Sequence, residues 1–302
     1  MRSNGTDQAE GLRRLLLREQ TQVITVMAGK PGAGQTSVTL NLAQALANLG
    51  KHVLVVDEQD TPRNVSASLG LLARHDLLDV VQGKCAVDEV MINTHGFRVL
   101  PAARAMRAQE KWGQSERHKL KAALAEASAG LDVLLIDAAM PVPNRTEAPN
   151  EAAARESALL VVVDTTVSGI TGGYALIKRL AVEDARLQFE IVVNKAAGGE
   201  AALKVFENMA QLARRNLAAR LDYIGHLPRD DRHKRATQMG KPVVGAFPGA
   251  AASKSYLELA QKLLRLPMRQ DETVEGARAV MRSVMGRVAQ PLHNRAMASV
   301  SS

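Results

Sequence analysis

Five short aliphatic runs, separated by longer segments with helical periodicity, constrain the fold more than any other feature. The runs are rich in Val, Ile and Leu, and they cover Val23–Ala28, Val53–Asp57, Val133–Asp137, Leu159–Asp164 and Ile191–Asn194. Short runs without polar alternation are typical of strands buried on both faces. The helical patterns cover Thr36–Leu49, Glu116–Ala129, Ile170–Glu183, Glu200–Ala219 and Ser253–Leu264. This alternation predicts an α/β fold, with a mostly parallel sheet and helices on both of its faces.

Changes in composition divide the chain into three parts. We expect a polar N-terminal head (1–20), one α/β domain (21–266) and a basic C-terminal tail (267–302). Within the α/β domain, Ala102–Glu116 and Pro141–Glu156 are polar or irregular, so we expect both segments to be loops.

The bulk composition excludes several classes of protein. A single cysteine, Cys85, excludes an internal disulfide and a cysteine-based metal site, and it suits a reducing compartment. No apolar run approaches the ~18 residues that a membrane-spanning helix needs, so we expect no such helix. The net charge of +8 favours an anionic partner, although a basic surface that is only solvated would give the same value.

A glycine-rich loop joins the first predicted strand to the first predicted helix. Its residues are Gly29, Lys30, Pro31, Gly32, Ala33, Gly34, Gln35, Thr36 and Ser37, with the spacing of a Walker A phosphate-binding loop, G-x-x-x-x-G-K-T. The glycines let backbone N–H groups converge on phosphate oxygens, and the helix N-terminus adds a favourable dipole. We therefore predict a nucleotide site. Gln35 replaces the lysine of the pattern, so it can hydrogen-bond a phosphate without neutralising it.

Polar residues at the ends of later strands complete the predicted site. Asp57 and Asp137 each end an aliphatic run, and with the Thr36 hydroxyl they are candidate Mg²⁺ ligands and catalytic groups. Asn194 and Lys195 follow the last run, where the Asn amide could read an adenine edge. Pro228 and Arg229 lie in a predicted turn, Leu227–Asp230, that could wall the base.

This order of motifs resembles the MinD/ParA family of P-loop ATPases, which belong to the SIMIBI class. The family pattern is K-G-G-x-G-K-T, then D-x-D, D-x-x-x-G and N-K or N-R, and the resemblance covers roughly residues 22–265. It implies ATP and Mg²⁺ as cofactors and a homodimer, possibly formed only with nucleotide bound. It also implies that Lys30 is the signature lysine, which crosses the dimer interface to the nucleotide of the second subunit.

Four positions depart from the family pattern. Gln35 replaces the phosphate-binding lysine, Gln59 replaces the second Asp of D-x-D, Pro141 replaces the glycine of D-x-x-x-G, and Pro31 replaces a loop glycine. All but Pro31 remove a contact to the γ-phosphate or to the attacking water, and proline has no N–H to donate. The interpretation is a weak or inactive ATPase. In the alternative, Lys30, Arg63 or another cation reaches the phosphates and Asp60 substitutes for Gln59.

The head carries a second motif. Asp7-Gln8-Ala9-Glu10-Gly11-Leu12-Arg13 resembles the D-Q-A-x-x-L-R segment of the FlhG (FleN) group, which regulates flagellar number and placement. In that group the segment stimulates the GTPase FlhF, so the resemblance implies an FlhF-type GTPase as partner. The implied contact residues are Asp7, Gln8, Ala9, Leu12 and Arg13. Leu12, Leu15 and Leu16 would give a helix one apolar face for such a partner.

The tail contains a predicted amphipathic helix between Val274 and Val288. Its apolar face includes Val274, Met281, Val284, Met285 and Val288, and its basic residues include Arg278 and Arg282. This pattern suits reversible attachment to an anionic membrane, and the resemblance implies a cytoplasmic protein held peripherally at the inner membrane. Alternatively, the helix packs on its own domain.

Two other functions remain open from the sequence. A ParA-like ATPase would bind DNA nonspecifically through a basic patch drawn from Arg214, Arg215, Arg220, Arg229, Arg232, Lys234 and Arg235. No helix-turn-helix pattern supports nucleic acid as the partner, so it is disfavoured. The other alternative is a scaffold protein that binds no nucleotide, in which the head motif is the functional element.

Overall fold

The computed structural model describes residues 21–266 except 95, 109–110, 140–156, 184–187 and 218. The predictions for the head, for the tail and for Pro141 lie outside these residues. They are therefore carried forward as predictions.

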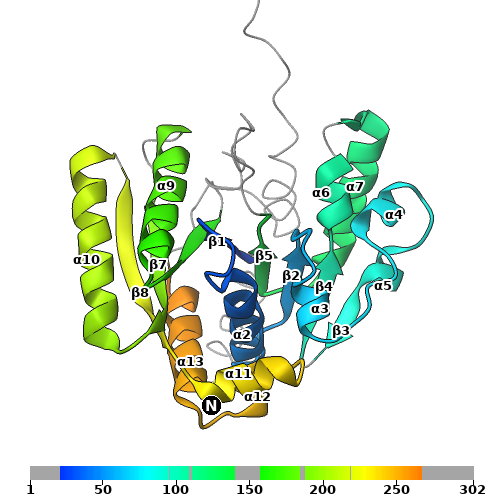
Figure 1. Ribbon diagram of the computed structural model, residues 1–302. Coiled ribbons are helices and arrows are strands. Elements are labelled where there is room, and N and C mark those ends of the chain that lie inside the picture. Colours follow the sequence, from blue (N-terminus) through cyan, green and yellow to red (C-terminus); the bar gives the residue numbers. More distant parts are fainter. Residues whose placement is uncertain are drawn as a thin grey trace, which may run out of the picture.

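The core of the molecule is one sheet of eight strands (Figure 1). The strands are β1 (Gln22–Ala28), β2 (Val53–Asp57), β3 (Ile92–Thr94), β4 (Phe97–Pro101), β5 (Val133–Asp137), β6 (Ala158–Asp164), β7 (Gln188–Ala196) and β8 (Arg220–Pro228). Their order across the sheet is β3-β4-β2-β5-β1-β6-β7-β8. All neighbouring pairs are parallel except β3 and β4. The predicted mostly parallel sheet is therefore confirmed.

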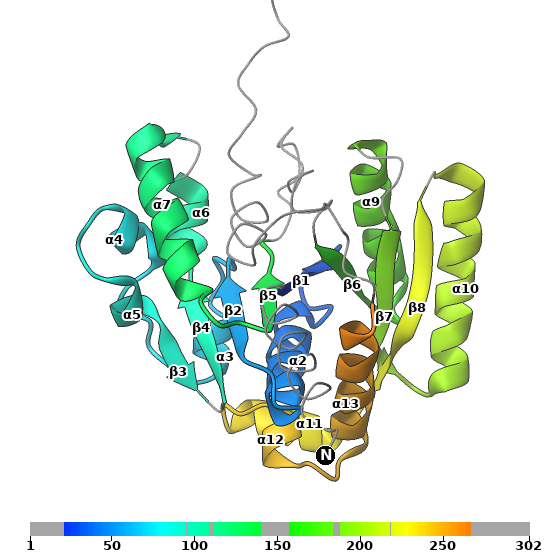
Figure 2. The same ribbon diagram turned by 180° about the vertical axis from the view of Figure 1, so that it is seen from behind.

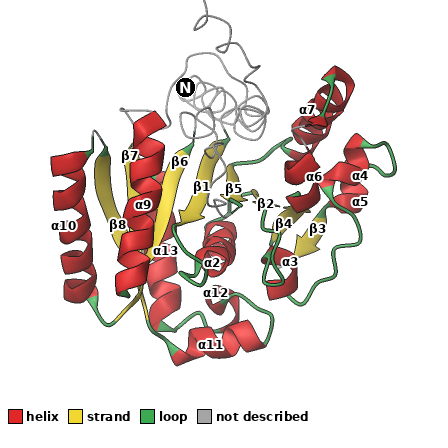
Figure 3. Ribbon diagram, turned by 45° about the horizontal axis from the view of Figure 1, so that its top comes forward, coloured by secondary structure: helices red, strands yellow, loops and turns green. Residues whose placement is uncertain are grey.

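Helices cover both faces of the sheet (Figures 1 and 2). One face packs against α4 (Leu77–Val81), α5 (Val87–Val90), α6 (Ala103–Ala108), α7 (Gln114–Ala127), α9 (Val167–Glu183) and α10 (Gly199–Asn216). The other packs against α2 (Gln35–Asn48), α3 (Val65–Ser68), α11 (Asp231–Gln238), α12 (Val243–Ala246) and α13 (Ala251–Leu264). Figure 3 shows α9 and α10 at the β8 end of the sheet and α4–α7 at the β3 end.

Successive strand residues supply two separate cores. In β1, Val23 and Met27 join the core under α9, whereas Ile24 and Val26 join the core under α2. Because side chains alternate across a strand, a run that is aliphatic at every position can only be buried on both faces. This is the physical basis of the strand prediction.

The expected loop Ala102–Glu116 is wrong in part, because it contains α6 and the first residues of α7. A distant side chain fixes the start of α6: the Asp76 carboxylate accepts hydrogen bonds from the backbone N–H groups of Arg104 (3.1 Å) and Ala105 (3.0 Å). Asp76 also caps α4 through Leu78 N–H. The sequence pattern around α6 could not reveal this cap, because the capping residue lies about 28 residues earlier in the chain.

The region after α10 also differs from the prediction. The helix ends at Asn216, three residues before the predicted end at Ala219, and the chain continues as β8 from Arg220. Pro228 is the last residue of β8, so the predicted turn Leu227–Asp230 is wrong at its start. An edge strand next to β7 needs few aliphatic residues, and β8 carries Asp222, His226 and Gly225 at a register shift. For this reason its pattern was too polar to stand out.

Candidate nucleotide-binding site

The predicted functional loops meet at one edge of the sheet. Strands β1, β2 and β5 are parallel neighbours, and Asp137 is a register partner of both Asp57 and Val26. On the other side of β1, Asp164 at the end of β6 pairs with Asn194 in β7. Ligands of parallel α/β sheets bind at this carboxyl edge. The structure thus brings together the glycine-rich loop, the two predicted carboxylates and the Asn194–Lys195 segment.

The glycine-rich loop has the backbone geometry of a phosphate cradle. Gly32 (φ 77°) and Gly34 (φ 103°) adopt left-handed conformations that disfavour other residues. Gly34 is the N-cap of α2, where no side chain caps the helix and no acidic residue lies in the first turn. The N-terminus of α2 is therefore open to an anion.

Gln35 turns inward from the loop. Its Nε2 group donates to Asp137 Oδ1 at 2.8 Å and to the Ala138 carbonyl at 2.7 Å. Only 6% of its surface is exposed. Both amide hydrogens are thus used within the protein, and the side chain fills the space behind the loop.

The predicted Mg²⁺ ligands lie close together and are hydrogen-bonded within the protein. Thr36 Oγ1 donates to Asp137 Oδ2 at 2.7 Å. Asp57 accepts from the backbone N–H groups of Gln59 (3.2 Å) and Val65 (2.9 Å). These hard oxygen atoms suit Mg²⁺, which takes few protein ligands and completes its shell with phosphate and water. Among the described residues, no group of three or more His, Cys, Asp or Glu side chains is placed to hold a metal ion.

Both carboxyl groups hold protons more tightly than usual. Burial, reinforced by the negative charge of Asp137, raises the pKa of Asp57 to about 7, against the pull of its backbone donors. Burial also raises the pKa of Asp137 to about 6, although hydrogen bonds from Thr36, Gln35 and Thr39 oppose the shift. Gln35 donates to Asp137 as a neutral amide, so it adds no positive charge that would lower either pKa.

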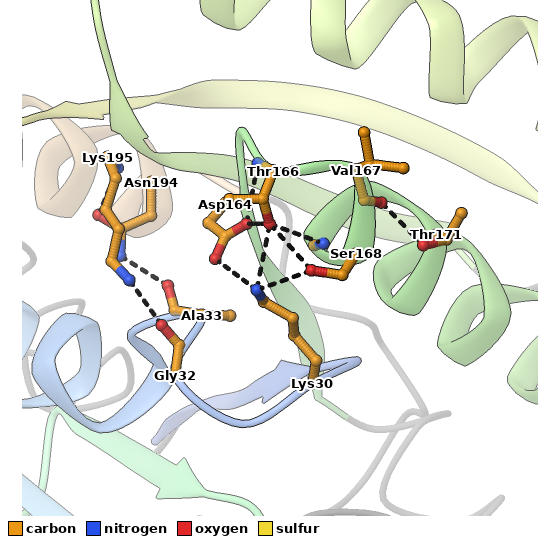
Figure 4. A network of polar contacts seen from close by, with 11 residues as sticks. Lys30, Gly32, Ala33, Asp164, Thr166, Val167, Ser168, Thr171, Asn194 and Lys195 are labelled. Carbon is orange, nitrogen blue, oxygen red and sulfur yellow. Dashed lines mark hydrogen bonds and ion pairs between the residues drawn. The ribbon is translucent and has the colours of Figure 1, made fainter.

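Lys30 is held inside its own chain (Figure 4). Its Nζ atom lies 3.1 Å from Asp164 Oδ2 and donates to Thr166 Oγ1 and Ser168 Oγ, each at 3.1 Å. Burial alone would raise the pKa of Asp164, but hydrogen bonds from Thr166 and Lys30 hold it below its usual value. The sequence analysis missed Asp164 as a site residue, although it ends a predicted strand just as Asp57 and Asp137 do.

Asn194 and Lys195 hold the glycine-rich loop from outside (Figure 4), and Arg229 in turn contacts Lys195. Asn194 Nδ2 donates to the Ala33 carbonyl at 2.8 Å, and Lys195 Nζ donates to the Gly32 carbonyl at 2.6 Å. Arg229 Nε donates to the Lys195 carbonyl at 3.1 Å. The sequence analysis assigned these residues to the base, which stays a prediction. The contacts in the structure join Asn194 and Lys195 to the phosphate loop and Arg229 to Lys195.

A histidine that the sequence analysis missed contacts the start of α2. His233 Nε2 lies 3.1 Å from Ser37 Oγ and 3.4 Å from the hydroxyl of the buried Tyr256. Burial lowers the pKa of His233, and Asp230 opposes this in part. No sequence signal marks the contact, because residues 37 and 233 meet only through the packing of α11 on α2.

The basic residues proposed for DNA do not form one patch. Arg214 and Arg215 end α10 and Arg220 begins β8, whereas Arg229, Arg232, Lys234 and Arg235 follow the other end of β8. A nine-residue strand separates the two groups by roughly 25 Å. Arg220 is also paired with Asp222 at 3.0 Å.

The parallel sheet, the glycine-rich loop and the strand-end carboxylates define a P-loop protein of the α/β class. A family model described as "AAA domain" matches residues 21–191. The antiactivator FleN of Pseudomonas aeruginosa is 34% identical over 248 residues, which cover 82% of this chain and 88% of FleN. The septum site-determining protein MinD of Bacillus subtilis is 26% identical over 88% of this chain and 98% of MinD. The chain belongs to the MinD/ParA family of P-loop ATPases.

Solved structures of this family have the same fold. The MinC:MinD cell division complex of Aquifex aeolicus matches with a TM-score of 0.59 and 26% identity, over 83% of this chain and 99% of that chain. MinD of Pyrococcus horikoshii, solved with Mg-ADP, matches with a TM-score of 0.60 and 20% identity, over 84% of this chain and 100% of that chain. Within the part of the chain described here, no helix combines the length and apolarity needed to cross a bilayer.

Proposed function

We propose that this protein is a nucleotide-binding regulator of flagellar number or placement, which acts through its head on an FlhF-type GTPase. The observation that carries the proposal is the likeness to the antiactivator FleN over most of both chains. The Asp7–Arg13 motif supports the choice of partner, because it matches every specified position of the D-Q-A-x-x-L-R pattern.

The proposed ligand is an adenine nucleotide, ATP or ADP, together with Mg²⁺. The open N-terminus of α2 and the left-handed glycines support phosphate binding. Thr36 and Asp137 would hold Mg²⁺ directly or through water, and the ion would neutralise phosphate charge. Asn194, Lys195 and Arg229 would support the loop from outside, and Pro228 would flank the base.

Hydrolysis of ATP is proposed to be weak or absent. Gln35 directs both amide hydrogens to Asp137 and Ala138, and Gln59 replaces a carboxylate of the family pattern. Loss of one transition-state donor typically costs ~3–4 kcal/mol of barrier. Lys30 cannot compensate in its present position, because Asp164, Thr166 and Ser168 surround its ammonium group.

The variant Gln35→Lys tests which group limits hydrolysis. If it raised the rate of ATP turnover, the missing lysine would be the limiting group. An unchanged rate would point to Gln59 or Pro141.

The test of the partner is GTP turnover by the cognate FlhF-type GTPase, measured with the full chain and with two variants. Arg13→Glu alters the last residue of the motif, and Arg14→Glu is the matched control one position outside it. We expect stimulation by the full chain, loss with Arg13→Glu and retention with Arg14→Glu. Equal turnover with and without the protein would contradict the proposed role.

We also propose that the tail attaches the protein reversibly to the inner face of an anionic membrane. The basic and apolar residues between Val274 and Val288 support this. Flotation with vesicles of anionic and of neutral lipid tests it. The full chain should float with anionic vesicles only, and removal of residues 270–302 should abolish flotation. Binding that survives this deletion would refute the anchor.

A proposed homodimer would use Lys30 in trans. The ammonium group must then leave Asp164, Thr166 and Ser168 before it can reach a second subunit. We therefore expect a monomer without nucleotide, and light scattering with and without Mg-ATP measures this.

A further inference from the structure

One backbone carbonyl joins the three loops at the nucleotide edge. The Ala138 oxygen accepts a hydrogen bond from Gln35 Nε2 at 2.7 Å and another from Gln59 Nε2 at 2.5 Å. Gln35 follows β1, Gln59 follows β2, and Ala138 follows β5. The two substitutions that depart furthest in charge from the family pattern therefore meet at a single atom.

These contacts are buried. The exposed fractions are 6% for Gln35, 4% for Gln59 and 2% for Ala138. A buried carbonyl with two donors stays satisfied when it loses one, but the loss of both leaves it unpaired. Each glutamine should consequently compensate in part for the loss of the other, so that removing both costs more stability than the two single losses together.

The neighbourhood of this carbonyl is rich in carboxyl groups. Asp57, Glu58 and Asp137 are each at most 2% exposed. Glu58 Oε2 accepts from Ala139 N–H at 3.2 Å, so its carboxyl group belongs to the same edge. The lysine of the pattern contacts both the β- and the γ-phosphate, so its replacement weakens the hold on both. A γ-phosphate would in addition bring further negative charge toward these carboxyl groups.

We propose that Gln35 and Gln59 form an amide lock on the Ala138 carbonyl, which holds the three loops together without nucleotide and makes the site prefer a nucleoside diphosphate to a triphosphate. Both glutamines are positioning residues in this account. The lock stands on the geometry alone, and only the ligand preference rests on the proposed nucleotide binding. A diphosphate fits the cradle with the lock closed, and a triphosphate has to open it.

The lock is tested by thermal unfolding of Gln35→Met, Gln59→Met and the double variant. Of the two donors that the described residues supply to Ala138, each single variant removes one and the double variant removes both. We expect the melting temperature of the double variant to fall by at least about 3 °C more than the sum of the single shifts. Additive shifts would overturn the lock.

Gln44→Met is the matched control for the cost of losing a buried glutamine from α2. Gln44 is also 6% exposed, and its Nε2 donates only to Asn48 in the same helix, at 2.9 Å. Combined with Gln59→Met, it should give an additive shift. If the Gln44→Met, Gln59→Met double variant also melted lower than the sum of its single shifts predicts, and by the same amount, the synergy would not come from Ala138. That result would overturn the lock.

The ligand preference is tested by calorimetry of the full chain with Mg-ADP and Mg-ATP. We expect ADP to bind about tenfold more tightly, and Gln59→Met to narrow the ratio because it weakens the lock. The pair Gln35→Lys with Gln59→Asp should reverse the preference. Equal affinities in the unmodified protein would overturn the preference. Binding of neither nucleotide would overturn the proposed nucleotide function, while the unfolding experiment would still decide the lock.

Discussion

Lys30 in the phosphate loop and Asp164 at the end of β6 form an ion pair of 3.1 Å that is almost closed to solvent on the Asp164 side. The ion pair joins the phosphate loop to β6. Lys30 also joins the loop to the first turn of α9, where it donates to Ser168. A cation that the sequence analysis assigned to a second subunit is thus part of the internal structure of this chain.

Removal of the Lys30 charge should destabilise the protein. Lys30→Met leaves the Asp164 carboxylate buried with hydrogen bonds from Thr166 only. We expect a loss of ~2 kcal/mol, which for a domain of this size lowers the melting temperature by roughly 4–8 °C.

Lys51→Met is the matched control for this measurement. Lys51 pairs with Asp132 at 3.7 Å, and both side chains are more than a third exposed. Its removal should change stability by less than ~0.5 kcal/mol. If the two variants melted at the same temperature, the Lys30–Asp164 pair would contribute no more to stability than the exposed Lys51–Asp132 pair.

Gly34 should not tolerate a side chain. A Cβ atom there would lie 2.2 Å from Asn194 Nδ2, and the φ of 103° is unfavourable for alanine. Gly34→Ala should therefore displace Asn194 from Ala33 and lower the melting temperature well beyond Gly50→Ala. Gly50 has a φ of 78° with nothing within 4 Å of an added Cβ, so it isolates the backbone cost. Equal losses would show that Asn194 moves aside freely.

The carboxyl group of Asp57 should make stability depend on pH. Its pKa rises from 3.8 to about 7 on folding, so the folded state binds the proton more tightly. The resulting stabilisation is complete below about pH 4 and is lost as the pH rises to about 7, by on the order of a few kcal/mol.

Asp57→Asn should flatten this dependence. Denaturant unfolding of both proteins between pH 4 and 8, in EDTA and without nucleotide, measures the difference between them. His233 contributes in the opposite direction to both proteins, because its lowered pKa costs stability as the pH falls. Parallel stability curves for the two proteins would contradict a raised pKa at Asp57.

Substitution of Asp76 should destabilise the protein more than substitution of most other carboxylates outside the nucleotide edge. It accepts backbone hydrogen bonds from Leu78, Arg104 and Ala105 and thereby starts two helices. Asp76→Ala should cost about 2–4 kcal/mol, whereas Asp88→Ala, in the first turn of α5, should cost less than ~1 kcal/mol. A similar loss for both would mean that the double cap contributes little.

The sequence predicted the elements whose signal is local. The five aliphatic runs became β1, β2, β5, β6 and β7, because a strand buried on both faces must be aliphatic throughout. Strands β3 and β8 were not predicted because they lie at the two ends of the described sheet, where polar residues suffice. Strand β4 was not predicted because its short apolar run is interrupted by Arg98. Helix α6 escaped because Asp76, from another loop, caps it.

The site was predictable as a set of positions but not as a set of contacts. Spacing placed Gln35, Asp57 and Asp137 at one edge. The register of β2 and β5 pairs Asp57 with Asp137, and Gln35 donates a hydrogen bond to Asp137. The direction of each side chain was not encoded locally. The inward turn of Gln35 and the capture of Lys30 by Asp164 depend on partners about 100 residues away or more.

The hydrogen bond from Gln22 Nε2 to the Leu263 carbonyl, 2.8 Å long, joins β1 to α13, the first and last elements of the described residues. The two ends of the α/β domain therefore meet. A short linker between them would allow circular permutation, with new termini in an exposed loop such as residues 72–75. In such a permuted protein, the head (1–20) and the tail (267–302) could be removed or replaced. The contacts within the sheet and its nucleotide edge would stay the same.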